Sequence, residues 1–472
     1  MRPVRAGLLV ITLLIFVVIL PAQVTTGTIS GTVGDSSGAV LPGAKVTILH
    51  EETGITRSVA ADAAGRYAVP SLAVGSYKVT AGVEGFQTEV RSGIVLTIGR
   101  EAVVNFALAV GAVSQTVEVT GEAPLVQTTE STVGYLIQDQ TIRDLPLNGR
   151  DLTELILLNP GVSAPTYAGT DNAFGGFGKK ISVSGFRGQD NAYLLDGAYI
   201  NDFSRHVPAG PSGALLGAET VQEFQMLTTS LNAQYGRVLG GVFNGVSKAG
   251  SNSYHMVLYE FLRNNSLDAR NFFDDEIPPF RRNQFGATLG GPVKKDKTFF
   301  FADYEGFSHQ SGVTNVTTVP TLKMRQGDFS ELTTPIFDPL SSPRVAFPGN
   351  QIPTNRFDAI ALKYIALYPA PTSAGTANNY SSVTQRTQDS STADARVDQR
   401  FNGANSLFVR YSINRIDTYT PAACPKDPAT GIEPGCGGGL AFPGPNNTTA
   451  HATQANYVRV FSPSLDRKST RL

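Results

Sequence analysis

The sequence predicts a mainly β protein of roughly three domains, and two observations carry this prediction. The first is composition: 48 Gly, 28 Pro and a hydrophobic fraction of 41% in 472 residues suit many short strands joined by turns. The second is patterning, since runs of alternating apolar and polar residues recur at short spacing from Thr28 onward. At roughly 150 residues per domain, the length gives about three domains. The formal net charge is -1, so the chain lacks the excess of Lys and Arg that nucleic-acid binding needs, and we exclude nucleic acid as a partner.

Residues 1–22 predict a secretory signal peptide that is removed by cleavage. Arg2 and Arg5 precede an apolar run at residues 6–20, and the small residue Ala22 after this run offers a site for cleavage. A transmembrane anchor is the alternative, but the run is shorter than the roughly 20 residues that a bilayer span needs. No other stretch approaches that length, so membrane insertion would have to use a β-barrel.

Residues 27–110 predict a small antiparallel β-sandwich of about seven short strands, which we expect to be detached from the domains that follow. The patterns G-T-V-x-D-x-x-G-x-x-L-P-G-A-x-V, D-x-x-G-x-Y and L-x-x-G-x-Y-x-V follow one another here. They resemble the carboxypeptidase regulatory-like domain, which implies a transthyretin-like, carbohydrate-binding-like sandwich. His50 and Glu51 are the nearest approach to a metal-ligand pair, and the five His are scattered. Because a zinc site needs three or four converging ligands, we expect no metal, no cofactor and no peptidase activity.

Residues 114–121 contain a short β-prone segment made of Gln115, Thr116, Val117, Glu118, Val119 and Thr120. Residues 121–124 that follow, Gly-Glu-Ala-Pro, would act as a loose tether. Two interpretations are open from the residues alone. The segment is either an exposed strand offered to a partner, or one more strand or linker of the sandwich.

Residues 125–250 predict an α+β domain with a fixed order of turns. A "DG" turn at Asp196-Gly197 follows an apolar strand, a "YG" turn stands at Tyr235-Gly236, and a "GG-V" strand start follows at residues 240–242. This order resembles the plug domain of TonB-dependent outer-membrane receptors, although Q-E-F at residues 222–224 replaces the family's arginine-containing element. The string L-P-L-N-G-R-D-L at residues 145–152, ending in P-G-V, resembles the Oar-like subgroup. We expect Asp151 to cap a helix over residues 152–158.

The resemblance implies a role for the segment at residues 115–120. It would be the TonB box, which adds as an extended strand to the sheet of a periplasmic TonB-type energy-coupling protein. The other implied partners are outer-membrane lipid and an extracellular ligand such as a glycan or a peptide.

Neither the glycine-rich runs nor Asp196 predict catalysis. A phosphate loop must follow a strand and open a helix, whereas Gly175–Gly178 is followed by Lys179-Lys180 entering a strand. An Asp-Gly pair after an apolar strand indicates turn chemistry rather than a catalytic acid. We therefore expect no enzyme.

Residues 252–472 predict part of an antiparallel outer-membrane β-barrel. In such barrels the short turns face the periplasm and the long loops face outward. We expect residues 305–394 to be mainly one external loop. Only about six strands fit, against about 22 in a full plugged barrel, so we interpret the sequence as a fragment. The candidate strands are residues 254–262, 284–289, 298–304, 396–401, 406–412 and 456–461.

Cys424 and Cys436 both lie in Pro- and Gly-rich loop sequence. In an exported chain, a disulfide that closes this loop is the expected pairing.

These features predict an energy-coupled receptor and transporter of the bacterial outer membrane, with the sandwich on the periplasmic side. The alternatives are a surface carbohydrate-binding or adhesion protein, in which the sandwich does the work, and an Oar-like receptor linked to export. The plug motifs favour the first and the last of these.

The signal peptide yields a direct prediction. N-terminal sequencing of the protein recovered from the outer-membrane fraction should begin near Gln23. An intact Met1, or recovery from the cytosol, would contradict it.

Overall fold

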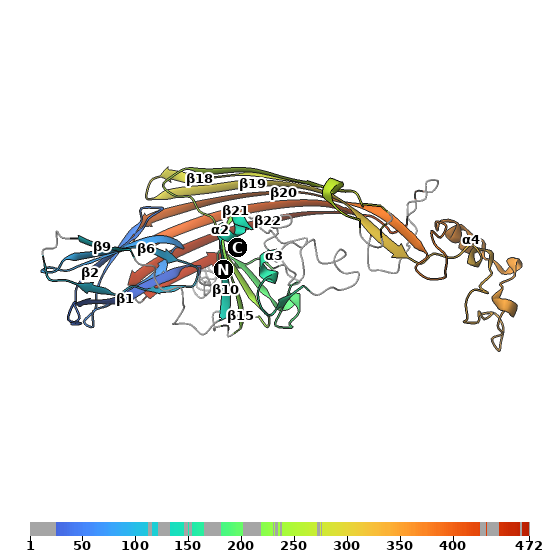
Figure 1. Cartoon of the computed structure of the whole chain (residues 1–472), viewed down its shortest axis with the longest axis horizontal. Helices are drawn as coiled ribbons and strands as arrows, with labels where there is room; N and C mark the ends of the chain where they lie inside the picture. The colour runs from blue at the N-terminus through green and yellow to red at the C-terminus, as the bar shows by residue number, and fades with distance from the viewer. Residues whose placement is uncertain are drawn as a thin grey trace, which may run out of the picture.

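The computed structural model describes residues 25–111, 116–120, 133–145, 150, 153–164, 181–201, 219–229, 231, 235–236, 238–270, 274, 276–424, 431, 443–462 and 465–471. Residues 1–24, and with them the predicted signal peptide, lie outside these ranges. The described part divides into a β-sandwich, a mixed α+β domain and a long curved sheet (Figure 1). None of its helices has the length and apolarity needed to cross a membrane.

The sandwich forms from short strands whose alternate residues face inward. In β2 (Lys45–His50), Val46, Ile48 and His50 are buried while the residues between them are not. One sheet has the order β4 (Arg66–Leu72), β1 (Gly27–Asp35), β7 (Glu101–Val103), with β8 (Phe106–Leu108) also paired to β1. The other has the order β3 (Thr56–Ala60), β2, β5 (Gly75–Gly82), β6 (Thr88–Leu96), β9 (Thr116–Thr120). A single apolar core, including Ile29, Val46, Ile48, Val79 and Leu96, joins the two sheets.

The α+β domain is built on a five-stranded sheet. Its order is β10 (Val133–Gln138), β15 (Val221–Thr229), β16 (Val242–Ser247), β13 (Ala192–Leu195), β14 (Ala198–Tyr199), and β13 and β16 run parallel. The hairpin of β11 (Val162–Ser163) and β12 (Ser182–Val183), the helices α2 (Asp139–Asp144) and α3 (Thr153–Leu157), and the 3-10 turn η2 (Gly188–Asp190) complete it. The core side chains include Ile142, Ile181, Val183 and Met226.

Two details of this domain differ from expectation. The helix expected over residues 152–158 is present as α3 at Thr153–Leu157, while its proposed cap Asp151 lies outside the described residues. Helix α2 was not expected, because one turn and a half offers only Ile142 as an inward residue and gives no helical periodicity.

The curved sheet is a meander of seven antiparallel strands in sequence order. It extends over the α+β domain as an arch (Figure 1). The strands are β17 (His255–Asn264), β18 (Phe280–Lys294), β19 (Thr298–Thr317), β20 (Tyr380–Asn402), β21 (Asn405–Thr420), β22 (Gly444–Ser462) and β23 (Leu465–Arg471). One strand more than the expected six is therefore present, and most strands are longer than expected.

The connections of the meander are short at one end and long at the other. The external loop is shorter than the expected residues 305–394. Strand β19 continues to Thr317 and β20 begins at Tyr380, so both ends of the expected loop belong to strands. The loop of residues 318–379 contains α4 (Ala359–Ala366), whose N-cap Asp358 accepts from the N–H groups of Ile360 and Ala361. The 3-10 turns η3 (Asn265–Leu267), η4 (Met324–Gln326), η5 (Pro348–Asn350) and η6 (Thr354–Arg356) also lie in the long connections.

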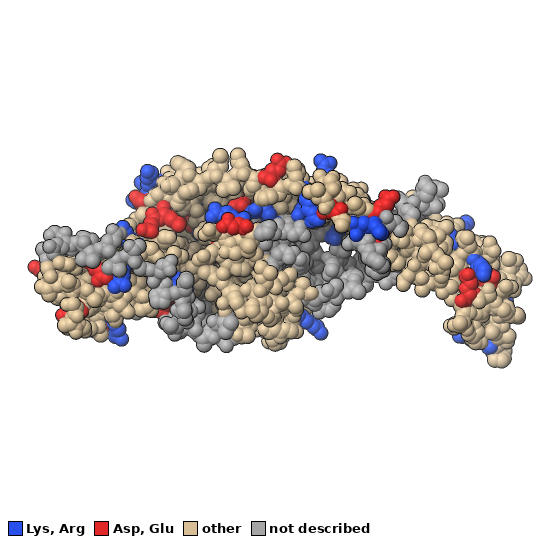
Figure 2. Space-filling model, in the orientation of Figure 1, with Lys and Arg blue, Asp and Glu red and all other residues tan. Residues whose placement is uncertain are grey.

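The two faces of the meander differ in polarity. Leu258, Tyr304 and Tyr411 are exposed on the outer face, with relative exposures of 69%, 45% and 41%. Alternate residues such as Asp303, Arg410 and Gln454 point toward the α+β domain and are buried. Figure 2 shows the outside of the arch as largely uncharged, with charged side chains gathered along the line where the arch meets the body below. This is the alternation of a membrane barrel, apolar toward lipid and polar inside.

We expected the sandwich to be detached, and this is wrong. The Asn252 N–H donates to the Glu52 carbonyl at 3.0 Å, and the Arg400 guanidinium donates to the Thr56 carbonyl at 2.9 Å. The sandwich therefore rests against the end of the meander that has the short turns, opposite α4 (Figure 1). It also contacts the α+β domain, because the Ile98 N–H donates to Glu223 Oε1 at 2.5 Å.

The Glu223 contact predicts a pH dependence of stability. Burial raises the pKa of the Glu223 carboxyl to about 7, against roughly 4.3 for an exposed Glu. The folded state then binds more protons than the unfolded state between these values, so the free energy of unfolding falls as the pH rises from about 4 to about 7. Glu223→Gln keeps the side-chain acceptor for the Ile98 N–H and removes this loss of stability, which amounts to at most ~4 kcal/mol above pH 7.

Differential scanning calorimetry in detergent at pH 5 and pH 8 measures the effect, since the chain has no Trp for fluorescence. Glu84→Gln, at an exposed Glu of the sandwich, is the matched control and should leave the pH dependence as in the wild type. An unaltered pH dependence in Glu223→Gln would contradict the prediction.

Candidate functional site at the contact between the α+β domain and the meander

The site centres on the turn between β13 and β14. Leu195 pairs with Ala198, which leaves Asp196 and Gly197 as the two turn residues. Both have positive φ, 52° and 81°, as a type I′ turn requires. Asp tolerates this left-handed conformation better than most residues, and Gly adopts it freely. The Asp-Gly turn that the sequence predicts is confirmed.

The side chain of Asp196 does more than form a turn. It is 1% exposed, and it accepts from the Ser247 N–H at 2.9 Å and from the Ser247 hydroxyl at 2.7 Å. Its carboxylate also forms ion pairs with Arg410 Nε at 3.2 Å and Arg396 Nη1 at 3.5 Å. A charge buried to this extent needs such partners, because an unpaired one costs several kcal/mol.

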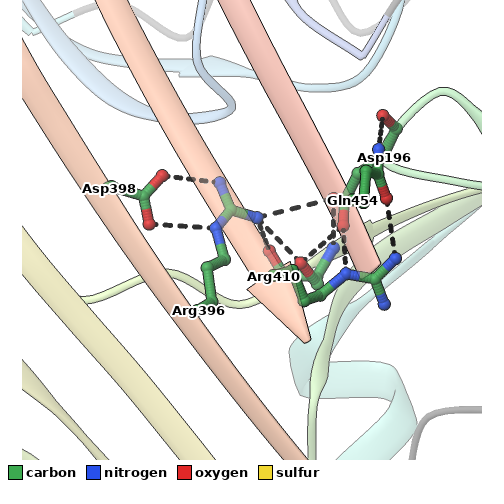
Figure 3. A network of polar contacts seen from close by, with 6 residues as sticks. Asp196, Arg396, Asp398, Arg410 and Gln454 are labelled. Atoms are coloured by element: carbon green, nitrogen blue, oxygen red, sulfur yellow. Dashed lines mark hydrogen bonds and ion pairs between the residues drawn. The ribbon is translucent and has the colours of Figure 1, made fainter. Parts of the chain in front are cut away.

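Three adjacent strands of the meander supply the Arg and Gln partners of Asp196 (Figure 3). Arg396 on β20 also binds Asp398 through two hydrogen bonds of 2.9 and 2.8 Å. Arg410 on β21 donates to Gln454 Oε1 at 2.8 Å, and Gln454 on β22 donates to the Asp196 carbonyl at 2.7 Å. We call this set the Asp196 cluster: Asp196, Ser247, Arg396, Asp398, Arg410 and Gln454.

A second group of charges lies in the same contact region. Arg150 pairs with Glu219, and Lys248 binds Asp139 at 2.8 Å and Glu219 at 3.7 Å. The Arg150 guanidinium also stacks on two aromatic rings of β17, 5.4 Å from the centroid of Tyr259 and 4.8 Å from that of Phe261. The α+β domain thus contacts the meander at two places, through the Asp196 cluster and through the cation–π contacts of Arg150.

A cavity of about 230 Å³ opens where the sandwich, the α+β domain and the meander meet. His50, Asp196 and Arg400 are among the residues that line it, one from each part. The Nδ1 of His50 faces the Thr53 hydroxyl at 2.9 Å and its Nε2 faces the Val74 carbonyl at 3.2 Å. Burial lowers the pKa of the His50 imidazole. His50, which the sequence singled out beside Glu51, is therefore engaged within the sandwich.

The residues that the sequence proposed as a site lie elsewhere. Thr116–Thr120 forms β9, which pairs in parallel with β6 at the edge of the sandwich, and Gln115 lies outside the described residues. Cys424 is buried, packs with Val319 and Tyr380 and is disulfide-bonded. Cys436 lies outside the described residues, so its pairing with Cys424 stays a prediction.

The sequence did not indicate Arg396, Arg410 or Gln454 as functional. These residues stand 200 or more positions from Asp196 and belong to no local motif. The one available indication was the alternation of polar with apolar residues at positions 393–398 of β20 and 409–413 of β21.

Three family models match successive parts of the chain. The carboxypeptidase regulatory-like domain matches residues 28–109, the TonB-dependent receptor plug domain matches residues 126–242, and the outer membrane beta barrel domain matches residues 246–466. The α+β domain is thus the plug, and the meander is part of the barrel.

Among curated proteins, the TonB-dependent transporter Oar of Myxococcus xanthus is 29% identical over 297 residues, 59% of this chain. The chain spans 26% of the length of that relative. Among solved structures, the siderophore receptor PirA of Acinetobacter baumannii is 15% identical with a TM-score of 0.38, covering 71% of this chain and 43% of its own. The ferric enterobactin receptor PfeA of Pseudomonas aeruginosa is 14% identical with a TM-score of 0.38, covering 71% and 44%.

The three matched domains follow one another along the chain, and the polarity of the meander's two faces agrees with the barrel match. The chain therefore belongs to the TonB-dependent receptors of the outer membrane, with an N-terminal carboxypeptidase regulatory-like domain, and it is similar to the Oar transporter.

Proposed function

We propose that this chain is the plug-bearing part of an energy-coupled transporter, in which a periplasmic TonB-type protein pulls the plug and so opens a path for an extracellular ligand. The Asp196 cluster is the observation that carries the proposal. It fastens one plug turn to three neighbouring barrel strands through side chains that are nearly all buried.

Ion pairs and hydrogen bonds suit a contact that must hold and yet be released. Their strength depends on geometry, so a displacement of the Asp196 turn by a few ångströms breaks several of them together. An apolar contact of the same area would loosen more gradually, because hydrophobic burial has no directional requirement. The plug is therefore held in one defined position until a force moves it.

We assign the coupling role to residues Gln115–Thr120, between the sandwich and the plug. Val and Thr favour the extended conformation that pairing with a partner's sheet needs. The sandwich lies at the short-turn end of the barrel strands, which is the periplasmic end of an outer-membrane barrel. A strand beside it is within reach of a periplasmic partner.

This proposal makes transport, rather than catalysis, the activity of the protein. The matched families are receptors and transporters. The buried Asp and Arg side chains of the contact region are used to fix the plug.

Asp196→Asn should weaken the hold of the barrel on the plug. Asn tolerates the left-handed turn, so the backbone is kept while the charge that balances Arg410 is lost. Removing one partner of a buried pair costs about 3–5 kcal/mol. We expect a lower unfolding temperature and a higher single-channel conductance in planar bilayers, measured on the protein purified from outer membranes.

Asp389→Asn is the matched control, since Asp389 lies on β20 but is exposed. It should leave both readouts unchanged. A wild-type conductance for Asp196→Asn, with the variant correctly folded, would show that the cluster does not hold the plug closed.

Val117→Pro should impair coupling. Proline removes a backbone N–H donor and blocks strand pairing, so binding to the periplasmic domain of the TonB-type protein should fall roughly tenfold or more. Pull-down with that purified domain measures it, and ligand uptake should fall in parallel. Val117→Thr keeps the N–H and the β-branched side chain, and serves as the control.

Unchanged binding by Val117→Pro would assign residues 115–120 to the sandwich or to a linker, which is the other interpretation of this segment.

A further inference from the structure

Two aspartates face each other on neighbouring barrel strands. Asp303 on β19 and Asp394 on β20 are direct partners in the antiparallel register. Both point toward the plug and are buried, with relative exposures of 6% and 5%. All four carboxylate oxygens are buried and accept no hydrogen bond from the described residues.

Such a pair is unfavourable without a compensating positive charge. Like charges opposite each other on adjacent strands repel, and burial strengthens the repulsion. Among the described residues, no Lys or Arg nitrogen forms an ion pair with either carboxylate. The nearby Arg396 is bound to Asp398 and Asp196, and Arg410, whose charge also acts on Asp394, forms its ion pair with Asp196.

Two hydroxyl groups complete the surroundings of this pair. Thr220 of the plug lies beside Asp303, and Ser412 on β21, the register partner of Asp394, lies beside Asp394. Each residue is 1% exposed, and each hydroxyl oxygen is buried without a hydrogen-bond partner among the described residues. Six oxygens from the plug and from three barrel strands are thus gathered, with the two hydroxyl groups as the donors beside the carboxylates and no Lys or Arg ion-paired to them among the described residues.

We propose that Asp303, Asp394, Thr220 and Ser412 form a binding site for one divalent cation, of which Ca²⁺ is the best match. Calcium takes six to eight oxygen ligands, carboxylates and neutral oxygens together, in flexible geometry. Two carboxylates carry the charge that one divalent cation balances. The described residues contain no group of three or more His, Cys, Asp or Glu that could hold a metal, so hydroxyl oxygens are needed to complete this set.

The site would add a third fastening between plug and barrel. Thr220 is its only plug ligand, and the other three residues belong to the barrel. The cation would therefore bind fully only when the plug is seated. This inference does not depend on the direction of transport or on the TonB box.

Cation binding is tested on the protein purified from outer membranes in detergent. After EDTA treatment, the protein is incubated with CaCl₂, desalted and assayed for bound metal by mass spectrometry, and its unfolding temperature is measured with Ca²⁺, Mg²⁺, Na⁺ or EDTA. We expect about one Ca²⁺ per chain and a higher unfolding temperature with Ca²⁺ than with EDTA.

Asp394→Asn should lose the bound Ca²⁺ and the stabilisation by Ca²⁺. In EDTA it should unfold at a temperature equal to or above that of the wild type, because the repulsion is removed. This second readout separates loss of a ligand from misfolding. Asp389→Asn, on the same strand, should bind Ca²⁺ as the wild type does.

The opposite result is equally definite. If the wild type retains no metal and none of the three cations changes its unfolding temperature, the two carboxylates share a proton instead and the cation site is overturned. Equal Ca²⁺ retention by the wild type and Asp394→Asn would overturn it as well.

Discussion

The arrangement of plug and barrel depends on a single buried carboxylate. Asp196 is nearly inaccessible to solvent, and both of the cations that balance it come from the barrel. A buried charge without partners would cost several kcal/mol, so the Asp196 turn is stable in this position only while the barrel strands surround it. Because β20, β21 and β22 must be aligned to present Arg396, Arg410 and Gln454 together, the same contact also favours one register of those strands.

Each barrel strand has one face toward lipid and one face toward the plug. Along β20, Val397 faces outward while Arg396 and Asp398 face the plug. The period of two that separates lipid from lumen therefore also brings polar side chains of adjacent strands into rows on the inner face. One such row holds Arg396, Arg410 and Gln454, and the next holds Asp303, Asp394 and Ser412. The rows explain how side chains from distant parts of the sequence meet.

The sequence was sufficient where the cause of structure is local. The short strands of the sandwich follow from alternation, and the Asp196-Gly197 turn follows from the backbone preferences of its two residues. These predictions agree with the structure, as does the mainly β class.

The remainder could not be predicted, because its causes lie far apart in the chain. Arg396 is 200 residues from Asp196, and no motif connects them. The strands β19 and β20 were expected to be shorter because their outer halves are rich in polar residues, which conceal alternation. The docking of the sandwich depends on the carbonyls of Glu52 and Thr56, and a backbone carbonyl is identical in every residue. A detached sandwich was the natural but mistaken expectation.

The parallel pairing of β9 with β6 has a consequence for reversibility. With β9 in place, the edge of the sandwich sheet at residues 88–92 is covered. A β9 that left this position would expose a row of unpaired N–H and C=O groups, and such an edge tends to pair again with any available extended segment. The nearest such segment is β9 itself, since it is tethered to the same sandwich a few residues away. After β9 has been pulled away from the sandwich, the free β6 edge would therefore favour its return to the same position. No second protein would be needed for this step.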